Sequence, residues 1–458
     1  MSKLSKANVK KTLHYFKRNG IKNTCYAIAE RLSGSSETAY QFVPVSLQEL
    51  EKQRNLAMQL SVTFSIVVPA YRTGEQYLRE LIACVKNQTY PRWELILADA
   101  TEDDSVEKLV RRIAQDARVC YIRLPENGGI SENTNKALAY ASGDYIGLLD
   151  HDDILTEDAL YEMAAAIEKK KRDGIEIQML YSDEDKCDGE GKHFFEPNIK
   201  TDFNLDLLLS NNYICHFLVI KQDLIKELGF RPEYDGAQDY DLVLRGVAKL
   251  QCCDEKIVHI PKVLYHWRCH NASTAENPQS KMYAYDAGCR ALQDFADRQG
   301  WKTTVQPLQH LGFYQMIYKE GALVQRKDLG AVGGRLLIGN KTAGGGMTAD
   351  GEVLYQGLRK GYSGYLHRAV LSQNVEALDI RCIQIREELW PLFQEVTGVP
   401  YQTIPRDDLF DVGTLPEGTD YVQLSLKLSE AIRSLGYRLL YTPDCVEKWN
   451  VGKHRIER

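Results

Sequence analysis

Between residues 64 and 182, short apolar runs alternate with longer segments in which apolar residues recur every three or four positions. The runs are rich in β-branched residues, which predicts strands, whereas the spacing of Leu78, Leu81 and Val85 predicts a helix with one apolar face. This alternation predicts an α/β domain with a doubly wound, mostly parallel sheet. The predicted strands cover residues 64–69, 93–98, 119–124, 145–149 and 179–182.

The composition limits the classes of protein to consider. The 458 residues exceed the ~100 to 200 of a typical domain, so we expect at least two domains. A net charge of -6 argues against a nucleic-acid binder, which usually has a basic face. No apolar run approaches the ~20 residues of a membrane helix, the start lacks the apolar core of a signal peptide, and the 11 cysteines form no CxxC pair. We therefore expect a cytoplasmic protein with reduced thiols.

The N-terminus forms a basic arm, because seven lysines and arginines precede the first acidic residue, Glu30. Val9, Leu13 and Phe16 recur at helical spacing beside them. Such a helix can lie on anionic lipid as a peripheral membrane contact, and it can equally pack on the protein as a solvated helix. The basic residues are Lys3, Lys6, Lys10, Lys11, Lys17, Arg18 and Lys22.

Two aspartates follow the fourth predicted strand. The sequence LDHDD places Asp150 and Asp152 two residues apart, and an extended backbone directs such side chains to the same side. Carboxylate oxygens are preferred ligands of hard divalent cations, so the pair is a candidate site for Mn²⁺ or Mg²⁺ and for a diphosphate held by that ion. The alternative is an Asp-rich turn in which Asp153 caps the next helix.

Polar residues also follow the second and third predicted strands. Asp99 ends the second strand, where a carboxylate can accept hydrogen bonds from a nucleotide base or ribose. The loop after the third strand contains Asn127, Asn133 and two glycines that permit close approach of a ligand. Each has a structural alternative, an Asx-turn for the aspartate and turns or helix caps for the asparagines.

A second group of candidates lies further along the chain. Asp239, in GAQDYDL, is a candidate general base, because a hydroxyl nucleophile near neutral pH needs a carboxylate to take its proton. Its alternative role, shared with Asp241, is to cap the helix that follows. In LYHWR, His266 is a candidate third metal ligand and Arg268 a candidate phosphate contact, although a lone histidine is more often structural.

These motifs together resemble family 2 glycosyltransferases of the bacterial cell-surface polysaccharide type, often called rhamnosyltransferase-like. The resemblance implies a GT-A fold, an inverting single displacement, a nucleotide-diphosphate sugar donor, with UDP or dTDP as first expectations, and Mn²⁺ or Mg²⁺. It also implies a glycan or lipid-linked acceptor. The motifs are FSIVVPAY (64–71), NQTYPRWELILAD (87–99), LDHDD (149–153), YSDED (181–185), NNYICH (211–216), GAQDYDL (236–242) and LYHWR (264–268).

The resemblance also implies roles for individual residues. Asp239 takes the place of the catalytic base, and Asp150, Asp152 and His266 those of metal ligands. Gln238 stands where many relatives have Glu, and Ala100 replaces an acid that is frequent after Asp99. The implied nucleotide-sugar contacts are Pro69, Tyr71, Asp99, Asn127, Asn133, Asp150 and Arg268, and the implied acceptor side consists of Asp183, Glu184, Asp185 and Gln238.

The C-terminal part resembles the latter half of a second glycosyltransferase module. The resemblance rests on GAVGGRLL (330–337), ADGEVLYQG (349–357) and GYRLLYTPD (436–444), and no strand followed by a DxD motif precedes them. We expect this module to be noncatalytic. The expected organisation is a helical extension over residues 1–60, a GT-A domain over 61–305 and the partial module over 306–458.

Two other functions share some of these features. A sugar nucleotidyltransferase also combines aspartates and a metal ion on an α/β sheet, but it usually has a glycine-rich, basic loop after the first strand, and residues 69–74 contain only Arg72 as a basic residue. A catalytically inactive nucleotide-sugar-binding scaffold would retain the fold without the acidic residues. The presence of Asp150, Asp152 and Asp239 favours an active transferase.

Overall fold

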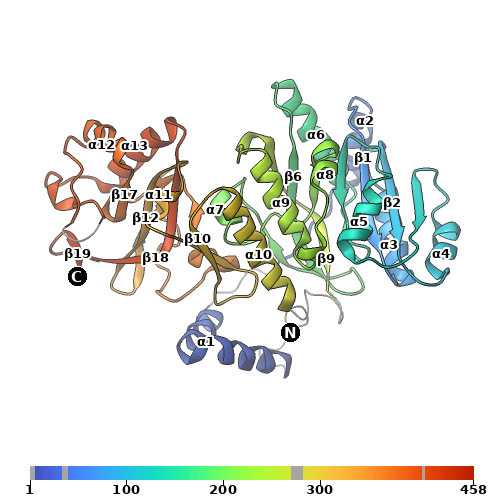
Figure 1. The fold of residues 1–458 in the computed structure, drawn as a ribbon, viewed down its shortest axis with the longest axis horizontal. Coiled ribbons are helices and arrows are strands. Elements are labelled where there is room, and N and C mark those ends of the chain that lie inside the picture. Colours follow the sequence, from blue (N-terminus) through green and yellow to red (C-terminus); the bar gives the residue numbers. More distant parts are fainter. Residues whose placement is uncertain (1–5, 34–39, 270–281, 405–407, 458) are drawn as a thin grey trace. The chain divides into compact units, whose positions relative to one another are not determined.

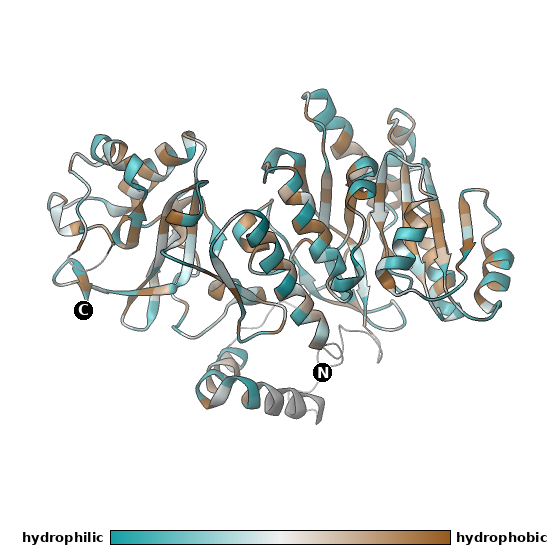
Figure 2. Ribbon diagram, in the orientation of Figure 1, coloured by the Kyte–Doolittle hydropathy of each residue, from teal (hydrophilic) through white to brown (hydrophobic). Residues whose placement is uncertain are grey.

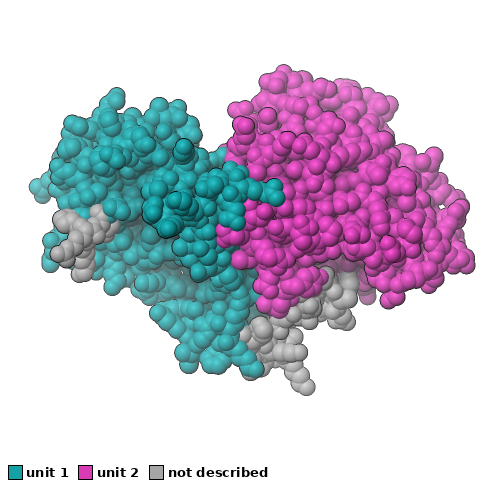
Figure 3. Space-filling view, viewed as in Figure 1, with its two compact units in different colours: residues 1–37, 204–211, 296–458 teal, residues 38–203, 212–295 magenta. Residues whose placement is uncertain are grey.

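The computed structural model describes residues 6–33, 40–269, 282–404 and 408–457. The chain divides into two compact units, coloured separately in Figure 3. Unit 1 comprises residues 1–37, 204–211 and 296–458, and unit 2 comprises residues 38–203 and 212–295. The short segment 204–211 therefore belongs to unit 1, although the sequence on both sides of it belongs to unit 2.

Unit 2 contains a nine-stranded mixed sheet in the order β3-β2-β1-β4-β8-β6-β9-β5, with β7 paired to β6 (Figure 1). The first four strands are mutually parallel, β8 is antiparallel to both of its neighbours, and β6 and β9 are again parallel. The strands are β1 (Phe64–Ala70), β2 (Trp93–Asp99), β3 (Val119–Arg123), β4 (Tyr145–Leu148), β5 (Ile154–Leu155), β6 (Met179–Cys187), β7 (Phe194–Asn198), β8 (Leu218–Lys221) and β9 (Ile257–Arg268).

Helices pack on this sheet through the apolar faces that the spacing predicts. Leu78, Leu81 and Val85 of α3 are all fully buried. In Figure 2 the strands β1 and β2 are predominantly hydrophobic, as expected for strands covered on both faces. The predicted α/β class is confirmed, and the sheet becomes mixed beyond β4. The helices are α2 (Leu47–Ala57), α3 (Glu75–Lys86), α4 (Ser105–Ile113), α5 (Ile130–Leu138), α6 (Ala159–Arg172), α8 (Gln222–Leu228), α9 (Gln238–Lys249) and α10 (Met282–Arg298).

Gly143, in the turn before β4, lies against the backbone of β1. A β-carbon at this position would lie 2.6 Å from the carbonyl carbon of Phe64 and 2.6 Å from the amide nitrogen of Ser65. Because backbone atoms in the middle of a sheet cannot move aside, we expect Gly143→Ala to lower the free energy of unfolding by about 1 to 3 kcal/mol. Urea unfolding of the purified chain measures this change.

The matched control for this prediction is Gly452→Ala. The nearest atom to its added β-carbon is Asn450 Oδ1 at 3.7 Å, which is ordinary van der Waals contact. An unfolding curve for Gly143→Ala that coincides with the control would show that the turn before β4 has room to adjust.

Unit 1 contains a second sheet in the order β13-β12-β18-β15, with β17 paired to β12 and β19 to β18. Its central pair, β12 and β18, is parallel. Phe393, Phe410, Ile432 and Tyr441 are among the residues of its core. The strands of this sheet are β12 (Leu329–Ile338), β13 (Lys341–Gly344), β15 (Gln373–Asn374), β17 (Ile383–Ile385), β18 (Arg438–Asn450) and β19 (Arg455–Glu457). Two further pairs are β10 (Thr303–Pro307) with β11 (Tyr314–Tyr318), and β14 (Gly346–Met347) with β16 (Ala377–Leu378). The helices are α7 (Leu205–Leu208), α11 (Ala322–Gln325), α12 (Trp390–Thr397) and α13 (Tyr421–Ser434).

The N-terminal segment forms helix α1 (Lys6–Ser33), which belongs to unit 1 and is interrupted at Gly20. The carboxylate of Glu30 accepts hydrogen bonds from the amides of Ser363 and Gly364, at 2.9 and 2.7 Å. Lys3 of the predicted basic arm lies outside the described residues. Among the helices of the described ranges, none is long and apolar enough to cross a membrane.

Candidate active site

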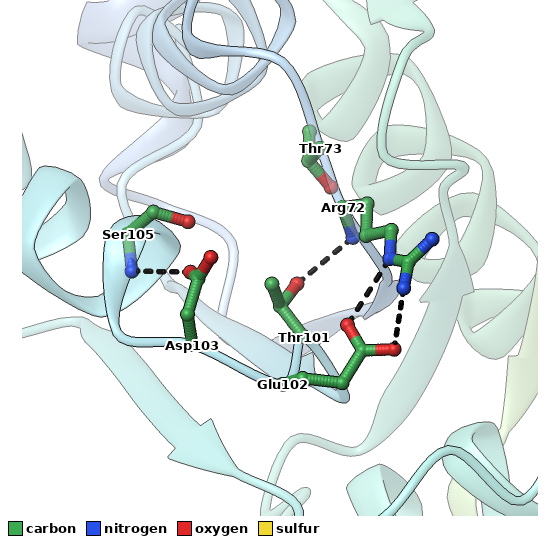
Figure 4. A pocket seen from close by; sticks show the side chains of 6 residues that line it. All are labelled: Arg72, Thr73, Thr101, Glu102, Asp103 and Ser105. Atoms are coloured by element: carbon green, nitrogen blue, oxygen red, sulfur yellow. Dashed lines mark hydrogen bonds and ion pairs between the residues drawn. The ribbon is translucent and has the colours of Figure 1, made fainter.

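A cavity of about 460 Å³ lies beyond the carboxyl ends of β1 and β2 (Figure 4). The Arg72 guanidinium donates to both oxygens of Glu102, at 2.8 and 3.1 Å, and the Arg72 amide donates to the Thr101 hydroxyl at 2.8 Å. The hydrogen bond from Arg72, with another from Tyr71, lowers the pKa of Glu102 to about 2. The residues on this side of the cavity, the cavity wall, therefore carry ionised groups and hydrogen-bonding groups. The cavity is lined by Arg72, Thr73, Thr101, Glu102, Asp103 and Ser105.

Asp99, the predicted nucleoside contact, is fully buried beneath this cavity wall. Its Oδ1 accepts from the amide and the hydroxyl of Thr101, at 3.0 and 2.6 Å, and its Oδ2 accepts from the Tyr121 hydroxyl at 2.7 Å. The carboxylate thus organises the loop, as the Asx-turn alternative describes. Thr101 and Glu102, which the sequence analysis did not single out, line the cavity instead.

The other predicted nucleotide contacts on this side hold their own loops. The Tyr71 hydroxyl donates to Glu102 at 2.8 Å, and Pro69 lies within β1. In the loop before α5, Asn127 Oδ1 accepts from the Asn133 side chain at 2.9 Å, and Asn133 Oδ1 accepts from the Gly128 amide at 3.2 Å. These two asparagines therefore shape the loop through contacts with each other.

The β4–β5 turn brings Asp150 and Asp153 close to His216, which precedes β8. One ligand atom from each of the three lies within 4.8 Å of the others. Burial raises the pKa of the Asp150 carboxyl. His216 lowers this pKa, whereas the charges of Asp152 and Asp239 raise it. Burial likewise holds the pKa of Asp153 well above its usual range. Ionisation of both acids is therefore unfavourable at this point unless a positive charge compensates it.

The Asp150, Asp153 and His216 group suits a divalent cation. Carboxylates are the ligand type that Mn²⁺ and Mg²⁺ prefer, and an imidazole can complete the ligands of Mn²⁺. A cation would also offset the raised pKa values of the two acids. His151 Nδ1, beside them, is buried without a hydrogen-bond partner in the described part of the chain. Asp153 already accepts from the Arg268 amide at 2.8 Å and from the Tyr265 hydroxyl, which fixes its carboxylate in place.

His266, the predicted third ligand, does not join this group. The neighbouring Tyr265 stacks on His216 with ring centroids 4.5 Å apart, and the Trp267 ring lies 6.0 Å from His216. Since successive residues of a strand point to opposite faces, His266 points away from His216. Its Nδ1 lies 2.5 Å from Asp185 Oδ1.

Asp185 and Arg268 are held by protein groups. The Tyr40 hydroxyl donates to the second oxygen of Asp185 at 2.7 Å. The buried Arg268 guanidinium donates to the Asp152 carbonyl at 2.5 Å and to Glu80 at 2.5 Å. The arginine therefore stabilises the β4–β5 turn from within, and the predicted phosphate contact is not available in this arrangement.

Asp239 lies in the first turn of α9 and faces the segment before β8. Its Oδ2 accepts from the Asn212 side chain at 2.9 Å, and the Cys215 thiol lies 3.5 Å from the same oxygen. Cys215 directly precedes His216, which belongs to the group with Asp150 and Asp153. Gln238 accepts from the Gly236 amide at 2.8 Å. The structure thus links Asp239 to the Asp150 group through residues 212–216.

The remaining predicted acceptor-side residues lie along β6. Asp183 Oδ1 accepts from the Lys200 amide at 2.8 Å and lies 2.9 Å from His259 Nε2. Glu184 accepts from the Asn198 side chain at 2.9 Å. Both acids are buried, so their role in this structure is to join β6 to its neighbours.

A comparison with known proteins identifies the family of the domain that contains this site. Residues 65–229 match the family model described as glycosyl transferase family 2. This part of the chain is a family 2 glycosyltransferase domain. It contains the cavity wall, the Asp150 group and the segment that carries Asn212 and His216. The GT-A class that the resemblance implied is thereby confirmed.

Two curated relatives that match the glycosyltransferase domain are much longer than this chain. An uncharacterized protein, y4gI, of Sinorhizobium fredii is 41% identical over 244 residues, which are 53% of this chain and 26% of that protein. The O-antigen biosynthesis protein RfbC of Myxococcus xanthus is 34% identical over 252 residues, which are 54% of this chain and 19% of RfbC. The chain thus spans about a quarter or less of these two proteins. Among solved structures, S. aureus TarS 1–349 in complex with UDP shares 18% identity and a TM-score of 0.38, covering 52% of this chain and 71% of that chain.

Proposed function

We propose that this chain transfers a sugar from a nucleotide-diphosphate donor to an acceptor hydroxyl, with inversion and with a divalent cation, in the synthesis of a bacterial polysaccharide. The observation that carries the proposal is that one short segment links the candidate base to the Asp150 group, because its Asn212 and Cys215 contact Asp239 and its His216 joins Asp150 and Asp153. This segment lies within the residues that match the family 2 model. The name of the relative RfbC supports the polysaccharide context.

The donor nucleotide is assigned to the cavity beyond β1 and β2. These strands and β4 are parallel neighbours, so their carboxyl ends share one edge of the sheet, where α/β proteins bind ligands. The Thr101 hydroxyl and the Glu102 carboxylate offer hydrogen bonds to a nucleoside, and Arg72 offers a cation. The donor would thus lie with its diphosphate toward the Asp150 group at the end of β4.

Charge at the Asp150 group explains why a cation is needed there. The diphosphate of the donor is negative, and buried carboxylates alone would repel it. A divalent ion, when bound by Asp150, Asp153 and His216, would supply the positive charge that a departing diphosphate requires. Asp152, two residues after Asp150, adds a further carboxylate to this turn.

Asp239 is assigned to the acceptor hydroxyl. Its carboxylate would accept the hydroxyl proton as the new bond to the anomeric carbon forms and the bond to the diphosphate breaks. With the base and the leaving group on opposite sides of the anomeric carbon, a single displacement inverts the configuration. We assign no catalytic role to residues 306–458, because the only metal-ligand group within the described ranges is the one in unit 2.

The test uses the cation and the donor separately. We expect the purified chain to bind one of a panel of UDP, dTDP or GDP sugars in the presence of Mn²⁺ or Mg²⁺, measured by calorimetry, and to release the nucleoside diphosphate slowly. Asp150→Asn should weaken Mn²⁺ binding by at least about tenfold, because a neutral amide replaces a carboxylate ligand.

The matched control is Asp223→Asn, an exposed acid in the first turn of α8. It should bind Mn²⁺ and donor like the unchanged protein. If no donor binds with either ion, or if Asp150→Asn binds Mn²⁺ as tightly as the control, the proposed function is wrong.

A further inference from the structure

The segment between residues 212 and 217 contacts both parts of the proposed site. Asn212 donates to Asp239 Oδ2 at 2.9 Å, and the Cys215 thiol lies 3.5 Å from the same oxygen. His216, the next residue, belongs to the group with Asp150 and Asp153. One short loop therefore carries the partners of the proposed base and a proposed metal ligand, and we call residues 212–217 the site loop.

The site loop is held by a buried lysine. The side chain of Lys200 has no exposed surface, and its ammonium donates to the Ile214 carbonyl at 2.7 Å and to the His216 carbonyl. Its carboxylate neighbour, Glu184, lies 3.5 Å away. Because a buried ammonium is costly unless its protons are accepted, the lysine and the two carbonyls stabilise each other.

The two carbonyls that Lys200 contacts lie on either side of Cys215. This residue has a φ of 25°, which is unfavourable for a residue with a β-carbon and persists only where the surroundings fix it. The two hydrogen bonds of Lys200 supply that restraint. Without them, we expect the backbone at residue 215 to relax and the side chains before and after it to move.

We propose that Lys200 is a positioning residue that fixes the site loop, so that Asn212 orients the Asp239 carboxylate while His216 is held within the Asp150 group. This inference rests on the proposed function. Both loop donors contact Oδ2 of Asp239, so the other oxygen, Oδ1, is the one we assign to the acceptor hydroxyl. The loop thereby couples activation of the acceptor to binding of the cation and diphosphate.

This coupling predicts different effects for two substitutions. Asn212→Ala removes one donor to Asp239 and leaves the contacts of Lys200 in place, so kcat should fall about tenfold or more while Mn²⁺ affinity and donor KM stay within about twofold. Lys200→Met removes the restraint on the whole loop. It should lower kcat and also weaken Mn²⁺ binding, measured by calorimetry without donor, by about tenfold or more.

Matched controls separate these effects from general ones. Asn450→Ala removes another asparagine amide that donates to a carboxylate, Glu457 at 3.2 Å, and Lys249→Met removes an exposed lysine paired with Glu227 at 2.6 Å. Both should keep the kcat and Mn²⁺ affinity of the unchanged chain. Circular dichroism and thermal unfolding establish that each variant is folded.

The possible outcomes separate a failure of the inference about Lys200 from a failure of the proposed function. If the unchanged chain neither binds Mn²⁺ nor transfers sugar, the proposed function fails. If it does both and folded Lys200→Met retains its Mn²⁺ affinity, the positioning role of Lys200 is overturned. Should Lys200→Met not fold, Asn212→Ala decides the matter, because an unchanged kcat would exclude control of Asp239 by the site loop.

Discussion

Replacing Asp239 with asparagine is expected to lower kcat by about 10² to 10⁴, the usual contribution of a general base, while donor and Mn²⁺ binding stay close to those of the unchanged chain. Asparagine retains the size of the side chain and can still contact Asn212, but it cannot take up the proton of the acceptor hydroxyl. Steady-state transfer kinetics with a fixed donor, combined with calorimetric binding of that donor, measure the two effects separately.

The control for this prediction is again Asp223→Asn, which neutralises an acid in the first turn of a helix, as Asp239→Asn does. The control should retain the kcat of the unchanged chain. Full transfer activity in Asp239→Asn would remove Asp239 from the role of base, and equal losses of activity and donor binding would point to damage of the donor site.

Replacing Arg326 with methionine is expected to destabilise unit 1 by about 3 to 5 kcal/mol. The Arg326 side chain has no exposed surface and donates to both oxygens of Asp206, at 2.8 and 3.2 Å, and to Asp328 at 2.6 Å. It also lies over the Trp301 ring, 4.6 Å from its centroid. Methionine would leave the buried carboxylate of Asp206 without its cation, and such an unpaired charge is costly.

Urea unfolding of the full chain, followed by a probe of unit 1, measures this effect. Arg433→Met serves as the control, because Arg433 pairs with Glu376 at 2.6 Å while both side chains remain substantially exposed, and exposed pairs contribute only ~0 to 1 kcal/mol. If the free energy of unfolding falls no further in Arg326→Met than in the control, unit 1 accommodates the unpaired acid.

The strands could be predicted from the sequence because burial on both faces imposes a simple pattern. The predicted strand at residues 64–69 is observed as Phe64–Ala70, and that at 93–98 as Trp93–Asp99. Both are short apolar runs bounded by polar turns. A strand covered on both faces is one of the few local structures that would bury such a run. The antiparallel part of the sheet was harder to predict from the sequence. β8 lies between β4 and β6 because of contacts that local periodicity does not encode.

The candidate site was predictable only in part, because a motif gives the position of a side chain along the chain but not its direction. LYHWR lies in β9, where Tyr265 contacts His216, while His266 lies on the opposite face beside Asp185. Asp99 lies at the expected strand end, but Thr101 and Tyr121 already occupy its oxygens. NNYICH contained His216 and Asn212, whose partners are distant in sequence.

The discontinuous make-up of unit 1 has a consequence for biosynthesis. Asp206 lies in the segment 204–211, whereas its partners Arg326 and Asn374 follow it by 120 and 168 residues. On the ribosome, this segment and its buried leucines emerge well before β15, on which α7 packs, and contacts so distant in sequence form slowly. A chain that ends near residue 300 would keep every motif of the glycosyltransferase family. Its α7 leucines would lack the β15 strand that packs on them, so we expect such a chain to bind chaperones or to aggregate.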